Sequence, residues 1–316
     1  MRQTIKPKQI ILSKRANVFY LEHVRVMQKD DRVVYFTNTD SEVERFFNIP
    51  ERNTAFLLLG KGTSITDAAA RKLAASNVVV GFVGNGGSPL FSMIDHAFLV
   101  PMSEYRPTEY MQAWMQMWLD ETTRLAVAKY MQTKRINWTT KAWDSNSDLK
   151  AKGIAISDSM AEEFVGKTGL AANTASLMAI EAEWAKKIYK LLARGYELGD
   201  FKREEGKGSR DTVEDVVNSF IDHGNYIAYG YAATSLNALG ISYALPVMHG
   251  KTRRGALVFD VADLMKDAIV LPLAFASAHQ GLRDQEFRDA LIESCMDGEV
   301  MDRLIQTIQN SIAKIA

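Results

Sequence analysis

The spacing of the apolar residues changes once along the chain, near Pro107, and this change limits the fold most. Before it, short runs rich in β-branched and aromatic residues predict strands. After it, apolar residues recur at helical spacing up to the C-terminus. We therefore expect an α+β chain, with an N-terminal β-rich domain over residues 1–104 and a C-terminal all-α domain over residues 105–316.

The predicted strands follow one another closely, at residues 9–13, 17–27, 32–37, 54–60 and 77–84. Residues 29–31 predict a hairpin turn between the second and third of them. One helix is expected among the strands, at 64–76, with Thr63 or Ser64 as its cap. Two polar stretches of the second part are expected to be loops, at 138–153 and 199–211.

Composition excludes several classes of protein. The 38 basic residues balance the 38 acidic ones, so net charge neither indicates nor excludes a nucleic-acid partner. Cys295 is the only cysteine, which excludes an intrachain disulfide and a cysteine-based zinc site. The first residues lack the apolar run of a signal peptide, and no apolar run approaches the roughly 18 residues that span a bilayer. We expect a soluble, cytoplasmic protein with no membrane partner.

Residues 257–271 are apolar except for one narrow polar stripe. On a helix with ~100° per residue, Asp260, Asp263 and Asp267 fall within about 60° of one another, and Lys266 borders them. Because burying unpaired carboxylates is very costly, this stripe must face water, cations or a metal. Taken alone, the stripe fits equally well an amphipathic helix whose thin polar edge meets solvent.

A second predicted helix, at 173–196, carries a carboxylate where an apolar residue is expected. Leu177, Trp184 and Ile188 follow the i, i+3, i+4 rhythm of a buried face, and this rhythm places an apolar residue at 181. Glu181 occupies that position instead. It is either a partly exposed residue at the boundary of the face or part of a functional site.

His249 completes a possible metal site. It lies eleven residues before Asp260, so a loop can bring it beside the carboxylates. An imidazole with carboxylates suits Mg²⁺ or Mn²⁺, and the histidine favours Mn²⁺. Cations beside such a site imply an anionic substrate such as phosphate, and four are close in the sequence: Lys251, Arg253, Arg254 and Lys266. This pattern indicates metal-dependent phosphodiester chemistry.

Three segments also resemble the CRISPR adaptation integrase family, which inserts new spacers. They are E181-AEWAKKI-Y189-KLLARGY, the pair H249-GK and D260-VA-D263-LMK, and LLLGKGTSITDAAARKLAASNVVVGFVG at 57–84. Their order and spacing agree with the family and cover most of the chain. The histidine loop MHGKTRRGALVFD looks most like the type I-F subtype. One position departs from the pattern, because Ala182 stands where many members have glycine after the glutamate.

The resemblance implies a metal-dependent DNA endonuclease and integrase. The metal ligands fall on Glu181, His249 and Asp263, with Asp260 as an adjacent acidic catalytic position. The 3′-hydroxyl of a prespacer would attack a phosphodiester of the CRISPR repeat by transesterification, on double-stranded and branched DNA. The resemblance further implies a homodimer formed through the N-terminal domains. Its partner is the second CRISPR-associated adaptation protein, which in type I-F is fused to a helicase-nuclease.

We expect the DNA contacts to fall on basic and aromatic positions of the helical domain. They are Lys187, Tyr189, Arg210, Lys251, Arg253, Arg254 and Lys266. Taken singly, each cation is as well explained by solvation, and Tyr189 by core packing. Two other functions stay open at this point: a divalent-metal nuclease or phosphoesterase with no role in integration, and a DNA-binding scaffold whose carboxylates are not catalytic.

Overall fold

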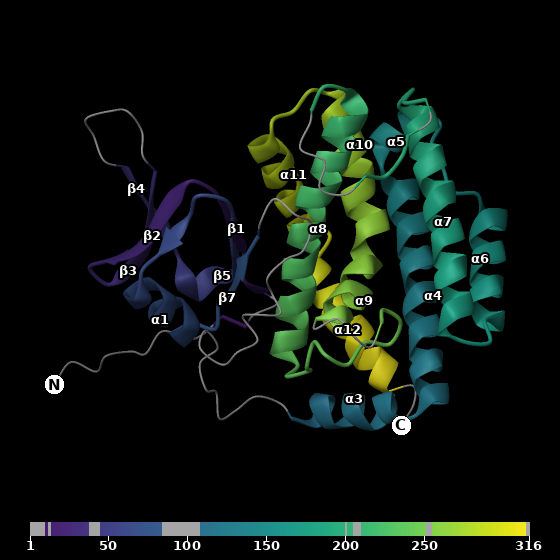
Figure 1. Ribbon diagram of the computed structural model, residues 1–316, viewed down its shortest axis with the longest axis horizontal. Coiled ribbons are helices and arrows are strands. Elements are labelled where there is room, and N and C mark those ends of the chain that lie inside the picture. Colours follow the sequence, from purple (N-terminus) through teal and green to yellow (C-terminus); the bar gives the residue numbers. More distant parts are fainter. Residues whose placement is uncertain are drawn as a thin grey trace.

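The computed structural model (Figure 1) describes residues 10–11, 14–37, 45–83, 108–199, 201–204, 210–250 and 255–313. Strands occupy the N-terminal part of the chain and helices the rest. The expected α+β class, with a β-rich region followed by a helical region, is confirmed. The proposed boundary at 104/105 lies outside the described residues.

The described residues of the N-terminal part form two small sheets. The first is parallel, in the order β1 (Asn17–Leu21), β5 (Thr54–Leu59) and β7 (Val79–Phe82). The second has the order β4 (Arg45–Ile49), β3 (Arg32–Thr37), β2 (Val24–Lys29) and β6 (Ser64–Ile65). Strand β3 is antiparallel to both of its neighbours, β2 and β4, whereas β6 runs parallel to β2.

Strand β5 is the element that joins the two parts of the molecule. All six of its residues are buried. Leu57 and Leu59 belong to a core inside the N-terminal part, whereas Phe56 and Leu58 belong to the core of the helical part. Because successive side chains of a strand point to opposite faces, a strand that is covered on both faces needs an unbroken apolar run. The helix α1 (Asp67–Ala75) packs on the first of these cores.

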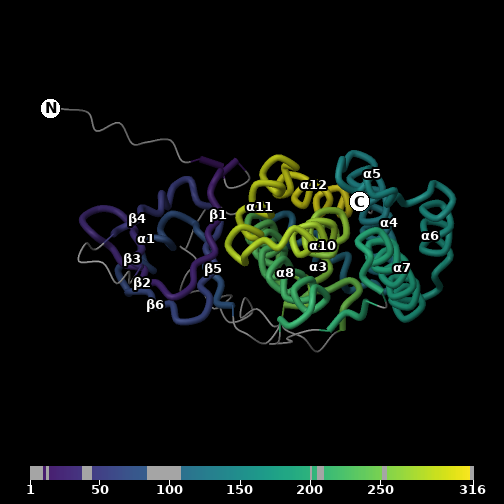
Figure 2. The backbone as a smooth tube through the Cα atoms, turned by 90° about the horizontal axis from the view of Figure 1, so that it is seen from above, coloured from purple at the N-terminus to yellow at the C-terminus, as the bar shows by residue number. Residues whose placement is uncertain are grey.

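Helix α8 lies beside the sheets in Figure 1 and contacts β5, and the helices that follow it in the chain pack against it. The helices are α3 (Glu109–Leu119), α4 (Glu121–Ser145), α5 (Ser147–Ala151), α6 (Asp158–Leu170), α7 (Thr174–Gly195), α8 (Val213–Ala238), α9 (Ala256–Met265), α10 (Leu271–His279), α11 (Asp284–Asp297) and α12 (Val300–Ala313). A π-helical turn, η3 (Lys266–Val270), links α9 to α10. Helices α4, α6 and α7 lie beside one another in both views (Figures 1 and 2).

Several local predictions are confirmed or corrected. The hairpin turn at residues 29–31 is confirmed between β2 and β3. The predicted strand 17–27 is in fact two strands in different sheets, separated at His23, whose φ is 54°. The helix α1 begins one residue after Thr66, whose hydroxyl caps it, rather than after Thr63 or Ser64. Strand β4 was not predicted.

The prediction of a loop at 138–153 is wrong. Helix α4 runs through Ser145, and α5 follows at once. The hydroxyls of Thr139 and Thr140 donate to carbonyls one turn back, and Trp143 is buried in the core. The polar composition of this stretch therefore belongs to a helix whose threonines are satisfied within it. Of the loop expected at 199–211, residues 200 and 205–209 lie outside the described part of the chain.

Candidate metal centre

Three side chains from distant parts of the sequence meet in the helical part. Glu181 lies on α7, Asp263 lies on α9, and His249 lies in the segment before α9. Each offers one ligand atom, and these three atoms lie within 4.8 Å of one another. The imidazole Nε2 of His249 is 3.7 Å from Oδ2 of Asp263. Ligand atoms that hold a cation at ~2.1 Å lie roughly 3 to 4 Å from one another. The three ligand atoms therefore need to approach one another only slightly to bind a cation.

Helix α7 directs Glu181 inward because its neighbours on the same face are buried. Leu177, Trp184 and Ile188 are each no more than 2% exposed. Asn173 and Ser176 form a capping box that fixes where the helix begins. The glutamate therefore replaces one member of a buried stripe, as its position in the sequence predicts. Its side chain is 15% exposed, and burial raises the pKa of Glu181 while Arg135 opposes that rise.

Asp260 is placed to hold the histidine segment. Its Oδ2 accepts from the backbone nitrogens of Val247 (2.7 Å) and Met248 (3.1 Å), and its Oδ1 accepts from that of His249 (3.0 Å). The same Oδ1 lies 2.6 Å from the imidazole Nδ1 of His249. Both oxygens are thus engaged, and Asp260 is not one of the three converging residues. In the structure, Asp260 therefore holds the histidine segment in place, and its expected role as a catalytic carboxylate stays a prediction.

The histidine carries a proton when the cluster holds no cation. Burial lowers the pKa of His249, but the hydrogen bond with Asp260 and the charges of Asp263 and Glu181 outweigh it and raise the pKa to about 9. A protonated imidazole cannot ligate a metal, so binding of a cation would release this proton.

Asp263 is kept ionised by its neighbours. Burial raises its pKa, but Lys266, Arg135 and His249 outweigh this effect and lower the pKa to about 2. The ammonium of Lys266 is 2.8 Å from Oδ1 of Asp263 and donates to the hydroxyl of Tyr229 at 3.1 Å. Lys266 is therefore held inside the cluster, with a side chain that is 15% exposed.

Arg135 on α4 is a residue of this cluster that the sequence reasoning missed. It is 5% exposed, and its guanidinium forms an ion pair with Glu181 and a bidentate pair with Asp267. Its neighbours at core spacing on α4, Met131 and Thr139, are buried. A charged residue on that line is the same signal that singled out Glu181, and it could have found Arg135.

The polar stripe of 257–271 faces cations, which is one of the surroundings expected for it above, but the segment is not one regular α-helix. The segment is an α-helix followed by a π-helical turn, and Asp267 lies in that turn. The alternative of a solvent-facing edge is wrong, because Asp260, Asp263 and Asp267 are only 4%, 6% and 2% exposed. The carboxylates face backbone donors and cations instead, and π-helical turns are frequently found at functional sites.

The structure places the predicted DNA-contact residues in different settings. Lys187 is half-buried and lies within ion-pair distance of Glu163 and Glu183. Tyr189 packs against Phe201, and burial raises the pKa of this tyrosine to about 12. Arg210 forms an ion pair with Asp284 at 2.6 Å and lies outside the cluster. Lys266 lies beside Asp263, and Lys251, Arg253 and Arg254 lie outside the described residues.

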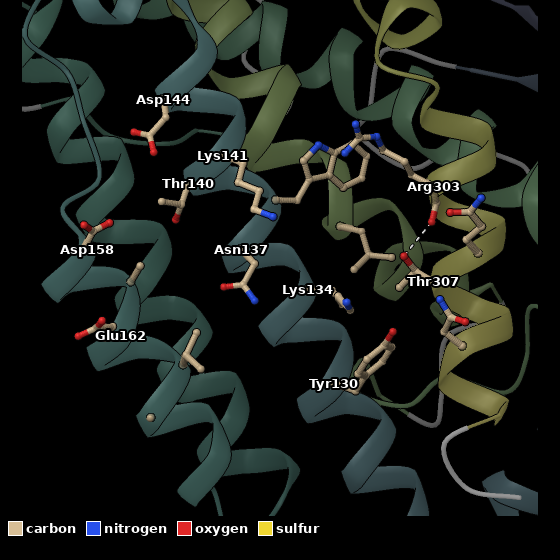
Figure 3. A pocket seen from close by; sticks show the side chains of 17 residues that line it. Tyr130, Lys134, Asn137, Thr140, Lys141, Asp144, Asp158, Glu162, Arg303 and Thr307 are labelled. Carbon is tan, nitrogen blue, oxygen red and sulfur yellow. Dashed lines mark hydrogen bonds between the residues drawn. The ribbon is translucent and has the colours of Figure 1, made fainter.

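A groove of about 990 Å³ lies along a different face of α4 (Figure 3). Lys134, Asn137 and Lys141 of α4 line it, with α6 on one side and α12 on the other. The α6 wall supplies Asp158 and Glu162. Asp144 of α4 adds a third carboxylate, and the groove shares no residue with the group of Glu181, His249 and Asp263. Among the described residues, none of the helices has the length and apolarity to cross a membrane.

Comparisons with known proteins agree over nearly the whole chain. The model of the CRISPR associated protein Cas1 family matches residues 18–310. The CRISPR-associated endonuclease Cas1 of Pseudomonas aeruginosa is 44% identical, covering 96% of this chain and 94% of the relative. The Cas1 endonuclease of Pectobacterium atrosepticum is 40% identical, covering 98% of this chain and 96% of the relative.

Solved structures share the fold at low sequence identity. A TtCas1–DNA complex matches with a TM-score of 0.67 and 22% identity, covering 94% of this chain and 91% of that one. A casposase bound to integration product matches with a TM-score of 0.65 and 15% identity, covering 93% of this chain and 82% of that one. A Cas6-RT-Cas1–Cas2 complex matches with a TM-score of 0.60 and 14% identity, covering 95% of this chain and 35% of that one. By the family match and the two relatives of at least 40% identity, the chain belongs to the Cas1 family of CRISPR-associated endonucleases.

Proposed function

We propose that this protein is a metal-dependent integrase of CRISPR spacer acquisition, which joins prespacer 3′-hydroxyl ends to the CRISPR repeat by transesterification. The observation that carries the proposal is the convergence of Glu181, His249 and Asp263 in a chain of the Cas1 family. Two carboxylates and one imidazole form a donor set that suits Mn²⁺ or Mg²⁺.

The three converging residues would hold the divalent cation. Once bound there, the cation supplies Lewis-acid polarisation of the scissile phosphate and lowers the pKa of the attacking hydroxyl. Asp260 fixes the imidazole so that Nδ1 donates to it and Nε2 points to Asp263. Lys266 keeps Asp263 ionised. These contacts hold Asp263 and the imidazole in place, and the imidazole would lose its proton when a cation binds.

The proposed partners are double-stranded and branched DNA, a second copy of this chain, and the second CRISPR-associated adaptation protein. The related structures support the first and last, since one contains DNA, one an integration product and one a Cas2 subunit. We assign the homodimer contact to the N-terminal part. Lys187, Tyr189, Arg210, Lys251, Arg253, Arg254 and Lys266 stay the proposed DNA contacts.

One assay separates the proposal from its alternatives. The protein, its partner subunit and Mn²⁺ are mixed with prespacer DNA and a supercoiled plasmid that carries a CRISPR array. Strand-transfer products that disappear in the Glu181→Ala variant support the integrase. Cleavage without joining indicates a nuclease that has no role in integration. DNA binding with no product from either form indicates a non-catalytic scaffold.

A further inference from the structure

Arg135 lies where α4, α7 and the η3 turn meet, and each nitrogen of its guanidinium faces a carboxylate. Its Nε and Nη2 donate to the two oxygens of Asp267, at 2.6 and 3.1 Å. Its Nη1 donates to Oε1 of Glu181 and lies 3.9 Å from Oδ2 of Asp263. A single buried cation thus connects the proposed ligands to a carboxylate outside the group of three.

Asp267 is a fixed anchor for this guanidinium. Its Oδ2 also accepts from the indole nitrogen of Trp184 at 2.9 Å. Its backbone carbonyl accepts from the indole nitrogen of Trp143, again at 2.9 Å. Since the planar guanidinium has two of its nitrogens bound to Asp267, the direction of Nη1 is set by the anchor rather than by the glutamate.

The anchored Nη1 restricts Glu181. A buried glutamate has several rotamers, and repulsion from Asp263 disfavours the one that faces inward. The ion pair with Arg135 opposes this repulsion and occupies Oε1. A carboxylate has a second oxygen with which to ligate a cation, and ligating carboxylates commonly receive hydrogen bonds from a surrounding shell.

We infer that Arg135 is a positioning residue of the metal centre: anchored on Asp267, it holds Glu181 in its ligating orientation and so strengthens divalent-cation binding. This inference rests on the proposed function, which makes Glu181 a ligand. Two alternative roles of Arg135 predict different results. The guanidinium could compete with the cation for Glu181, or the Arg135–Asp267 pair could serve the fold alone.

Titration of the full-length protein with Mn²⁺, followed by calorimetry or by the electron paramagnetic resonance of free Mn²⁺, tests the inference without an activity assay. The double variant Arg135→Met with Asp267→Asn removes one positive and one negative charge together. It leaves no unpaired charge at position 267, where an amide oxygen still accepts from Trp184, whereas Glu181 loses its partner. We expect its dissociation constant for Mn²⁺ to rise roughly 10- to 100-fold, as for other lost partners of metal ligands.

Two further variants define the control and the mechanism. Arg288→Met with Glu22→Gln removes another ion pair of a buried arginine, joined at 3.1 Å away from the cluster, and should leave the Mn²⁺ affinity unchanged. Arg135→Lys keeps the positive charge but lacks the fork that reaches both carboxylates. It should also bind Mn²⁺ more weakly, whereas a purely electrostatic role would leave its affinity at the level of the parent protein.

The outcomes are distinguishable. If the unaltered protein binds no Mn²⁺, the proposed metal centre itself fails. If the unaltered protein binds and the Arg135/Asp267 double variant binds equally well, the pair serves the fold alone and the inference is overturned. Tighter binding by the double variant would show competition and would also overturn it. Urea unfolding monitors the fold of each variant, and if the double variant does not fold, Arg135→Lys and the near-isosteric Asp267→Asn decide the question by the same titration.

Discussion

Asp260 and His249 are joined twice, through the backbone nitrogen of the histidine at 3.0 Å and through its imidazole Nδ1 at 2.6 Å. A carboxylate only accepts hydrogen bonds, so Nδ1 carries the proton and Nε2 is the nitrogen left for a metal. The same carboxylate also accepts from Val247 and Met248, which fixes the path of the chain just before the histidine.

Replacing Asp260 by Asn should therefore weaken metal binding although Asp260 is not a ligand. The amide nitrogen would point a donor at one or more of the donors that now surround the carboxylate. We expect the Mn²⁺ dissociation constant to rise roughly 10- to 100-fold, measured by calorimetric titration. Asp222→Asn, which alters a carboxylate paired with Arg203, is the control and should not change it. Equal affinity of the Asp260 variant and the parent protein would contradict this role.

The Asp263→Asn variant should lose strand transfer while it keeps its affinity for DNA. The change removes one charged ligand, but the amide oxygen can still accept from Lys266, so the lysine keeps a partner. The proposed phosphate contacts lie mostly on other residues, and binding measured by gel shift should stay within about twofold of the parent protein. Parallel loss of DNA binding in a folded variant would argue that Asp263 acts in binding rather than in the reaction.

Glu181 and His249 show how far the sequence could lead to this site. Glu181 could be predicted because helical periodicity assigns each residue to a face, and a carboxylate on an apolar face stands out. Periodicity carries no information on how helices pack, so it could not show that Glu181 meets His249. That expectation came from the short spacing between His249 and Asp260 and from the resemblance to the family. That packing is what brings the three ligand atoms within 4.8 Å.

Arg135 and Asp267 show where the sequence reasoning stopped. The polarity of residues 138–153 predicts a loop, which shortens the helix that carries Arg135 and hides the buried face on which this arginine lies. Asp267 was grouped with Asp260 and Asp263 on an ideal helix. The π-helical turn changes its direction, and its pairing with Arg135 depends on a contact between α4 and η3.

Strand β5 shows the same limit on the scale of the fold. Its apolar run predicted a strand, and the order of strands and helices predicted an α+β chain. The division of its residues between two cores depends on α8, more than 150 residues later in the chain. Only the tertiary contact tells which of its faces meets the helices.

His223 predicts a loss of stability on mild acidification. It lies on α8 against the ring of Tyr20, its Nδ1 has no partner within the described chain, and Asp284, Glu22, Arg288 and Arg210 surround it. Burial lowers its pKa below the usual 6.5, with Asp284 opposing. As the pH falls, His223 is therefore protonated in the unfolded chain at a higher pH than in the folded protein. The stability due to the neutral imidazole is present above about pH 6.5 and is lost below it, by at most ~1.4 kcal/mol per pH unit.

Urea unfolding of His223→Gln between pH 7 and pH 5 measures this contribution. The free energy of unfolding should fall less steeply with decreasing pH than in the parent protein, because one group that titrates differently in the two states is gone. His279→Gln alters an exposed histidine and should follow the parent curve. Indistinguishable slopes for all three proteins would show that His223 is protonated equally in the folded and unfolded states.

Gly230 allows α8 to approach the parallel sheet. A Cβ atom at this position would lie 2.4 Å from Cε2 of Phe56 and 2.8 Å from two further atoms of the ring. The ring cannot easily turn away, because Phe56 is fully buried and packs edge-on against Tyr231 at 5.0 Å. The Gly230→Ala variant should therefore lose about 1–3 kcal/mol of stability from overpacking, which exceeds the ~1 kcal/mol that alanine gains over glycine in a helix.

Gly166→Ala is the matched control for Gly230→Ala. Gly166 lies inside α6, and nothing lies within 4 Å of a Cβ atom built there. This variant should gain roughly 0.5–1 kcal/mol, since only the helix preference of the residue changes. Opposite signs in the two urea midpoints would attribute the loss to the contact between α8 and β5. A gain in both variants would mean that the sheet yields at Phe56, and that the joint between the two parts of the molecule is looser than the burial of β5 indicates.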